Sequence, residues 1–171
     1  MAYSPIADAD HIVRHCKKKF LIWKDGEVVG VQPEAFALRP PSGDRPQETY
    51  LSAVHYEHFL GNHLARMKAC CEATPLQPKP EDRLLFINAG LLKKSGTYGR
   101  YKVRAFLMPK ADRKSYSGIH GLPVKTDADL NNRLLTQCVL ERMAVKEALA
   151  PPAGVEAGIA AQLASWSRSS I

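Results

Sequence analysis

Two short segments carry the side chains best suited to acid–base chemistry. Residues 8–14 read D-x-D-H-x-x-R, and residues 115–121 read S-Y-S-G-I-H-G. An imidazole can move a proton, a carboxylate can orient that imidazole, and a guanidinium can hold a phosphate. If the chain is an enzyme acting on a phosphate-bearing substrate, such a site also requires the two histidines to lie close together. The candidate catalytic residues are His11, Arg14, Ser117 and His120.

Neither segment matches a motif that would establish catalysis. The second segment lacks the G-x-S-x-G pattern of a nucleophile elbow and the G-x-x-x-x-G-K-[ST] pattern of a phosphate loop. In the competing interpretation, the first segment is the start of a strand with a salt bridge, and the second is a structural loop. The sequence therefore favours a protein that is not an enzyme.

Positive charge is concentrated in one segment, residues 91–125. The whole chain has a net charge of +7, and this segment alone holds nine basic residues against one acidic residue, a net charge of +8. A concentrated positive field favours contact with phosphates or with another acidic surface. The residues expected to contact nucleic acid are Lys93, Lys94, Arg100, Lys102, Arg104, Arg113 and Lys114.

Residues 100–108 show the clearest local alternation in the chain. Period two predicts a strand with Arg100, Lys102 and Arg104 on one face, because alternate side chains of a strand point the same way. Nearby aromatic side chains are suited to stacking on bases. These are Tyr98, Tyr101, Phe106 and Tyr116.

Histidines and cysteines give no metal signature. His55, His58 and His63 follow an H-x-x-H-x-x-x-x-H pattern, whereas a helix usually holds a metal through H-x-x-x-H and a third ligand. The four cysteines have no C-x-x-C spacing, which favours free thiols in a reducing compartment. We therefore expect neither a metal nor another cofactor.

Turn-forming residues and hydrophobic periodicity predict the elements that position these residues. Strands are expected at 10–16, 20–23, 27–31, 34–39, 82–89 and 100–108, with a hairpin turn at Asp25-Gly26. Helices are expected at 52–72 and from Thr126 to about 150, the second opened by a capping box with Asp129. Residues 91–99 and 109–124 are expected to be a turn and a loop. This order predicts one α+β domain over residues 1–150, with a mostly antiparallel sheet and two main helices. Residues 151–171 are expected to form an alanine-rich short helix or tail.

Length and composition fit this picture. A chain of 171 residues with 45% hydrophobic and 24% charged residues is typical of one soluble domain. No apolar run approaches the roughly 20 residues needed to span a bilayer, and the start of the sequence has no apolar core of a secretory signal. We therefore expect a cytoplasmic protein without membrane contact.

Four segments together resemble a family of small bacterial proteins of uncharacterised activity. They are D-x-D-H-I-V-R at 8–14, Y-L-S at 50–52, L-F-I-N-A-G at 85–90 and S-G-I-H-G-L-P at 117–123. The resemblance covers roughly residues 8–145 and implies a bacterial, cytosolic setting in which the first and last motifs converge. The family pattern has a histidine where this chain has Tyr116, so no acid–base role carries over to that position.

The leading hypothesis is a non-catalytic accessory module. It would use the basic surface of residues 91–125 to bind nucleic acid, or to dock on a larger assembly that handles nucleic acid. An acidic protein surface is the alternative partner. Two further alternatives remain: the phosphate-substrate enzyme described above, and a protein-interaction subunit of a multi-gene bacterial system.

Overall fold

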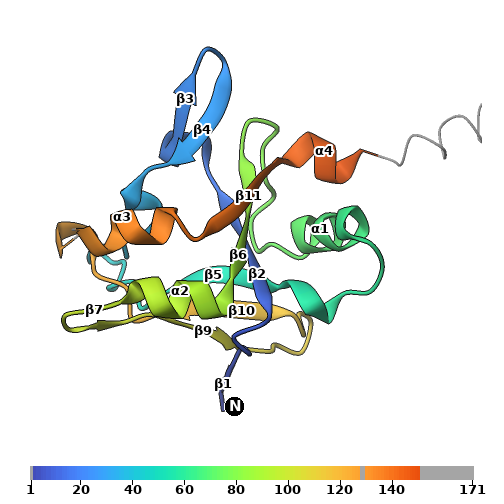
Figure 1. Cartoon of the computed structure of the whole chain (residues 1–171). Helices are drawn as coiled ribbons and strands as arrows, with labels where there is room; N and C mark the ends of the chain where they lie inside the picture. The colour runs from blue at the N-terminus through green and yellow to red at the C-terminus, as the bar shows by residue number, and fades with distance from the viewer. Residues whose placement is uncertain (1, 128–129, 151–171) are drawn as a thin grey trace, which may run out of the picture.

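The computed structural model describes residues 2–127 and 130–150. It shows an α+β domain whose main sheet, in the described residues, has seven strands in the order β1-β9-β10-β5-β2-β6-β11, all antiparallel (Figure 1). The predicted fold class is confirmed. The expectations for residues 151–171 and for Asp129 lie outside the described residues. The strands are β1 (Ser4–Pro5), β2 (His11–Cys16), β5 (Tyr50–His55), β6 (Arg83–Asn88), β9 (Arg104–Leu107), β10 (Tyr116–His120) and β11 (Val139–Ala144).

Two small hairpins project from this sheet. β3 (Leu21–Lys24) and β4 (Glu27–Val31) form the first, and β7 (Thr97–Tyr98) and β8 (Tyr101–Lys102) form the second. Asp25 and Gly26 turn the first hairpin with φ values of 51° and 80°. Two successive residues with positive φ are what a tight hairpin matched to strand twist requires. This predicted turn and its two strands are confirmed.

Helices lie on both faces of the sheet. Asn62 and Asn88 open the two longer ones, because each side-chain oxygen accepts a hydrogen bond from a backbone N–H three residues later, at 2.9 and 2.8 Å. The α-helices are α1 (His63–Glu72), α2 (Ala89–Gly96), α3 (Leu130–Thr136) and α4 (Val145–Leu149). The 3-10 turns are η1 (Lys18–Phe20), η2 (Pro33–Phe36), η3 (Tyr56–His58) and η4 (Lys125–Asp127). No helix among the described residues is long and apolar enough to cross a bilayer.

The sheet separates two apolar cores. The larger contains Ile12, Leu85 and Ile119 and is covered by α2 and α3. The smaller contains Val13 and Leu84 and is covered by α1 and α4. Neighbouring residues such as Ile12 and Val13 enter opposite cores, because successive side chains of a strand point to opposite faces. All four cysteines are buried free thiols, and burial raises the pKa of Cys16 to about 11.

Several predicted elements are wrong, and strand pairing explains the largest differences. Residues 52–72 are not one helix: β5 occupies the first part, where it pairs with both β2 and β10, and α1 begins only at His63. Residues 126–150 are likewise interrupted by β11, which pairs with β6. The long loop expected at 109–124 contains β10, which lies between β9 and β5. In each case, hydrogen bonding to strands distant in sequence overrides the local pattern.

Smaller differences are local. Residues 34–39 contain the 3-10 turn η2 rather than a strand, because Pro33 opens a helical turn there. The turn expected at 91–99 is largely α2, which Asn88 caps. The single strand expected at 100–108 is divided into β8 and β9, on either side of the buried Val103.

Gly96 lets α2 approach β9. A Cβ at this position would overlap the Val103 side chain and lie 3.1 Å from Leu135 Cδ2. We expect Gly96→Ala to lower the free energy of unfolding by about 1–3 kcal/mol, because the core would be overpacked. Urea denaturation measures this change. Gly30→Ala is the control, since its Cβ would meet only the exposed, flexible tip of Ile22 at 3.3 Å; equal destabilisation by both variants would contradict the assignment.

Candidate nucleic-acid interface

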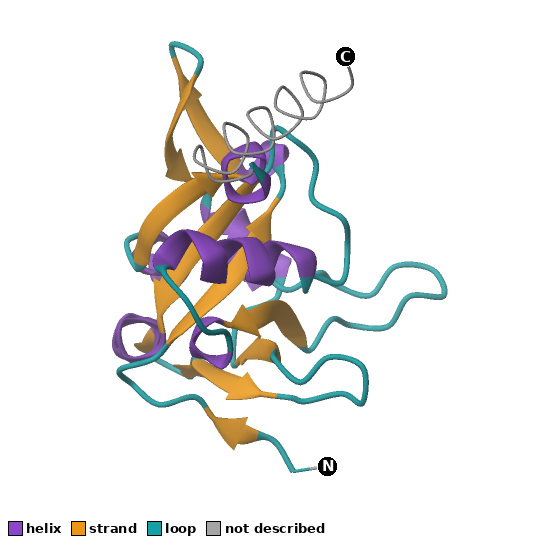
Figure 2. Cartoon of the chain, turned by 90° about the vertical axis from the view of Figure 1, so that its right-hand side faces the viewer, coloured by secondary structure: helices purple, strands orange, loops and turns teal. Residues whose placement is uncertain are grey.

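One face of the strands β9, β10 and β5 is left uncovered by the described helices. Ile119 and Ala105 point from these strands into the larger core beneath α2. The residues that alternate with them, Phe106 and His120, point the other way. Figures 1 and 2 show the described helices above β1, β9 and β10. We call this uncovered surface the open face; its partly exposed residues are Tyr50, Ser52, Arg104, Phe106 and His120, with the exposed Tyr3 beside them. Met108, Tyr116 and Gly118 belong to the same face but are buried.

Aromatic rings gather around His120 on the open face. The His120 ring stacks on Tyr50 with ring centres 5.0 Å apart and an interplanar angle of 20°. Phe106 meets the same ring edge-on at 5.3 Å, and the exposed Tyr3 ring lies 5.8 Å away. Desolvation lowers the pKa of His120. The imidazole is therefore neutral at pH 7 and forms part of an aromatic surface.

Gly118 makes this arrangement possible. A Cβ here would lie 2.9 Å from Tyr50 Cδ2, 2.6 Å from Met108 Sδ and 3.0 Å from His120 Nε2. The absent side chain therefore lets the neighbouring side chains lie across the backbone of β10. This explains a glycine in the middle of an inner strand, where it would otherwise weaken the sheet.

Cationic side chains flank the aromatic rings. Arg104 lies opposite His120 in the strand register, and its Nη1 donates to the Val103 carbonyl at 2.8 Å and to Thr97 Oγ1 at 3.0 Å. Lys110 Nζ lies 4.1 Å from the Tyr116 ring centre, and the Arg113 guanidinium lies 5.3 Å from it. Lys110 and Arg113 therefore contact a ring of the open face, whereas the Arg104 guanidinium is held by Thr97 at the start of β7.

The Tyr116 hydroxyl links β10 to two side chains of β5. Its hydroxyl lies 3.1 Å from the Tyr50 hydroxyl and 3.1 Å from Ser52 Oγ. The hydrogen bond with Tyr116 is the main cause that raises the pKa of Tyr50 to about 12. The Tyr50 phenol consequently stays neutral in the physiological range, and the two rings are held by hydrogen bonds as well as by packing.

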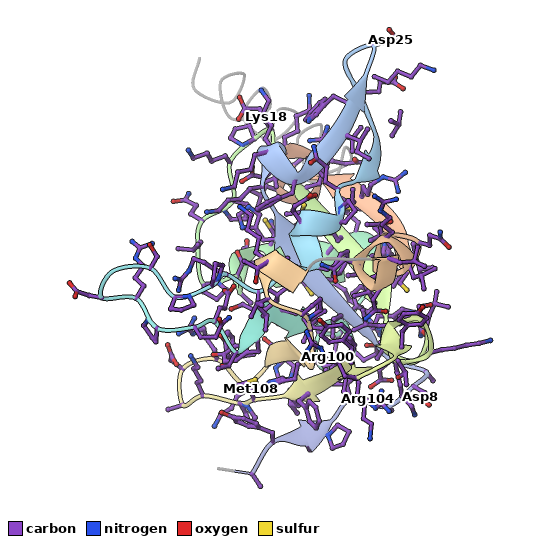
Figure 3. The ribbon with its side chains drawn as sticks, turned by 90° about the vertical axis from the view of Figure 1, so that its left-hand side faces the viewer. Asp8, Lys18, Asp25, Arg100, Arg104 and Met108 are labelled. Carbon is purple, nitrogen blue, oxygen red and sulfur yellow. The ribbon has the colours of Figure 1, made fainter. Side chains whose placement is uncertain are left out.

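The predicted nucleic-acid contacts are distributed over three places. Arg104 belongs to the open face, Arg113 lies against the Tyr116 ring from the loop before β10, and the exposed Lys114 follows Arg113 in that loop. Arg100 and Lys102 lie on or beside the β7–β8 hairpin, because the strand breaks at Val103 (Figure 3). Lys93 and Lys94 lie on α2, across the sheet from the open face, and Lys93 Nζ contacts Asp8 Oδ2 at 2.9 Å.

The four candidate catalytic side chains do not meet. Ile12, next to His11, pairs with His55 at one end of β5, whereas His120 pairs with Tyr50 at the other end. At about 3.3 Å per residue, these pairing positions are separated by roughly 16 Å along the strand. His11 instead stacks on Phe86 at 4.5 Å.

The other two candidates, Ser117 and Arg14, lie on the side of the sheet that faces the larger core. Ser117 is fully buried and donates to the Ser115 carbonyl at 3.0 Å. Arg14 Nη1 donates to the Ser52 carbonyl at 2.7 Å, and desolvation lowers the pKa of this guanidinium. The first and last motifs of the resemblance lie on β2 and β10, which are separated by β5.

A second basic region lies outside the 91–125 segment. A cavity of about 430 Å³ is lined by His15, Lys79, Asp82 and the three consecutive lysines at 17–19, among others. Asp82 organises it by accepting hydrogen bonds from His15 Nε2 at 2.7 Å and from the backbone N–H groups of Lys18 and Lys79 at 3.0 and 2.9 Å. None of the open-face residues lines this cavity.

Sequence reasoning named Arg104 and Arg113 but not Lys110 as contacts, and it missed Tyr3, Tyr50 and His120 as members of the aromatic surface. The sequence did carry a signal, since the apolar Leu51 and Ala53 alternate with Tyr50 and Ser52, as in a half-covered strand. The structure buries Leu51 and Ala53 and leaves Tyr50 and Ser52 partly exposed. Assigning these residues to a helix hid that alternation. Comparison with protein-family models, curated protein sequences and solved structures finds no match to this chain, so only its own residues bear on its function.

Proposed function

We propose that the chain is a binding module for single-stranded nucleic acid, and that the open face is the binding surface. The observation that carries the proposal is the set of rings around His120, on a sheet face with no described helix over it, flanked by Arg104, Lys110 and Arg113. A partner with both flat apolar groups and regularly spaced negative charges fits this combination.

Single-stranded nucleic acid has that chemistry. Its unpaired bases stack on aromatic side chains, at about 1–3 kcal/mol for each base, and its phosphates pair with lysine and arginine. In a duplex the bases are already stacked on one another and cannot lie on a flat protein surface. The proposal therefore includes a preference for single strands over duplexes, with little base specificity.

Fluorescence anisotropy tests this proposal with labelled single-stranded DNA, single-stranded RNA and duplex DNA. We expect single strands to bind more tightly than the duplex. Three neutralised phosphates predict a slope of about −2 when the logarithm of affinity is plotted against the logarithm of salt concentration. Absence of binding at low salt, or tighter binding of the duplex, would contradict the proposal.

Phe106→Ala separates stacking from charge. Phe106 is partly exposed and contacts the His120 ring, so its removal takes away stacking surface but no cation. We expect affinity for a single strand to fall about 5- to 100-fold, while the salt slope stays the same. Anisotropy at several salt concentrations measures both quantities.

Trp23→Ala is the matched control for this variant. Trp23 is an aromatic side chain, 37% exposed, on the β3–β4 hairpin rather than on the open face. Its replacement should leave affinity unchanged. An equal loss of affinity in both variants would show that exposed aromatic rings act without regard to their position.

A further inference from the structure

A histidine and two carboxylates converge at the end of β5 opposite Tyr50. Asp10 precedes β2, His55 ends β5, and Glu57 follows in η3. One ligand atom from each of these three side chains lies within 4.8 Å of the others. The side chains of Asp10, His55 and Glu57 are 31%, 17% and 26% exposed, so a small ion can reach them from solvent.

The distances suit a shared cation. His55 Nε2 lies 2.9 Å from Asp10 Oδ2 and 3.6 Å from Glu57 Oε2. In a tetrahedral zinc site, bonds of about 2.0–2.1 Å place neighbouring ligand atoms about 3.3 Å apart. The observed separations bracket this value, so small side-chain movements would bring the three atoms into contact with one ion.

Charge in the cluster also favours a cation. Two carboxylates lie close together, and within residues 2–127 and 130–150 their ion pairs are with imidazoles, not with lysine or arginine. A neutral imidazole has one N–H, so Nε2 of His55 can donate to only one of the two carboxylates near it. A divalent cation would interact favourably with all three ligand atoms at once.

The three residues are held in place by neighbouring groups. Glu57 accepts a hydrogen bond from the His11 backbone N–H at 2.8 Å, and its other oxygen lies 2.6 Å from His11 Nδ1. The His55 backbone N–H donates to the Ser115 carbonyl at 2.8 Å. Asn88 Nδ2 donates to the Asp10 carbonyl at 3.2 Å. Outer contacts to a ligand side chain, such as those from His11 to Glu57, orient metal ligands.

We propose that Asp10, His55 and Glu57 bind a divalent cation of the zinc or manganese type, with His11 positioning Glu57. Imidazole is a good ligand for zinc, and carboxylates also accept manganese. Three protein ligands leave further coordination positions for water or another ligand. This inference uses none of the open-face residues and is independent of the proposed function.

Sequence reasoning did not predict this site, because its ligands do not lie on one helix. The H-x-x-H-x-x-x-x-H spacing of His55, His58 and His63 argued against a metal bound by histidines of one helix. In the structure, β5 and η3 place His55 beside Glu57 rather than beside another histidine of this pattern. Asp10 is the residue before β2, and the pairing of β2 with β5 brings it to His55.

Isothermal titration of the full, metal-free chain with ZnCl₂ and with MnCl₂ tests the proposal. We expect one ion for each chain, and at least about tenfold weaker binding in Asp10→Asn, His55→Gln and Glu57→Gln. Glu141→Gln is the control, because Glu141 Oε2 contacts His63 Nε2 at 2.6 Å in a comparable pair to which the described part of the chain adds no third ligand. Failure of both ions to bind, or equal binding by wild type and all three variants, would overturn the proposal.

A second measurement requires no substitution. Mn²⁺ is paramagnetic and broadens the NMR signals of nearby nuclei, so substoichiometric MnCl₂ should broaden the amide signals of residues 10, 11, 55 and 57 first. Earlier broadening around His63 and Glu141, or around the cavity at residues 17–19, would place the ion elsewhere and overturn the assignment.

Discussion

Replacing Arg104, Lys110 and Arg113 together with glutamine is expected to weaken binding of a single-stranded oligonucleotide by about a hundredfold at low salt. Lys110 and Arg113 contact the Tyr116 ring, and Arg104 lies opposite His120 in the strand register. Removing three phosphate contacts should also reduce the magnitude of the salt slope by about 2, since each contact to a single strand contributes about 0.7. Anisotropy titrations at several salt concentrations give both values.

A second triple variant controls for net charge. Lys17, Lys18 and Lys19 are exposed and line the cavity beside Asp82 rather than the open face. Changing them to glutamine removes the same three positive charges. We expect less than about a threefold loss of affinity, because the Debye length of roughly 8–10 Å limits the reach of distant exposed charges. Equal losses in the two variants would show that total charge, not the open face, determines binding.

Asp82→Ala is expected to have the largest effect on stability. This carboxylate is 4% exposed and accepts three hydrogen bonds, from His15, Lys18 and Lys79. They tie the loop before β6 to β2 and η1. Removing one partner of a buried charged network costs about 3–5 kcal/mol, which urea denaturation at pH 7 would show as a lower midpoint.

The same network predicts a pH dependence. Desolvation raises the pKa of Asp82, but hydrogen bonds from Lys79, His15 and Lys18 outweigh it and lower the pKa overall. A lowered folded-state pKa means that the stabilisation is present above the unfolded-state pKa and is lost as pH falls through the folded value. Wild type should therefore lose this contribution at acid pH, below about 4, whereas Asp82→Ala should not.

Asp8→Ala is the matched control. Asp8 also forms an ion pair, with Lys93, but its side chain is 63% exposed. Solvent screens such a pair, and its removal should cost less than about 1 kcal/mol. If Asp82→Ala were no more destabilising than Asp8→Ala, the buried network would not be a major source of stability.

Local signals predicted only part of the fold. The β3–β4 hairpin was predictable because Asp25-Gly26 determines its turn, and β6 because residues 84–87 are a continuous apolar run. β5, β10 and β11 were not, because each depends on a partner distant in sequence. β10, for example, contains Ser117 and Gly118, which have little strand preference by themselves.

The candidate interface was predictable to a similar extent. Counting charges found Arg104 and Arg113, since net charge is additive along the sequence. It could not separate them from Lys93 and Lys94, because the side of the sheet on which a residue lies depends on tertiary packing. Phe106 contacts the His120 ring, which in turn contacts the rings of Tyr3 and Tyr50. These three partners come from three separate segments of the chain.

The most direct test of the open face is an NMR titration of the ¹⁵N-labelled full chain with a short single-stranded oligonucleotide. We predict that the largest amide shifts occur in 50–52, 104–108 and 116–120, and that α2 and residues 17–19 change little. Largest shifts on α2 or around the cavity at residues 17–19, or no shifts at saturating oligonucleotide, would contradict the assignment of the open face as the binding surface.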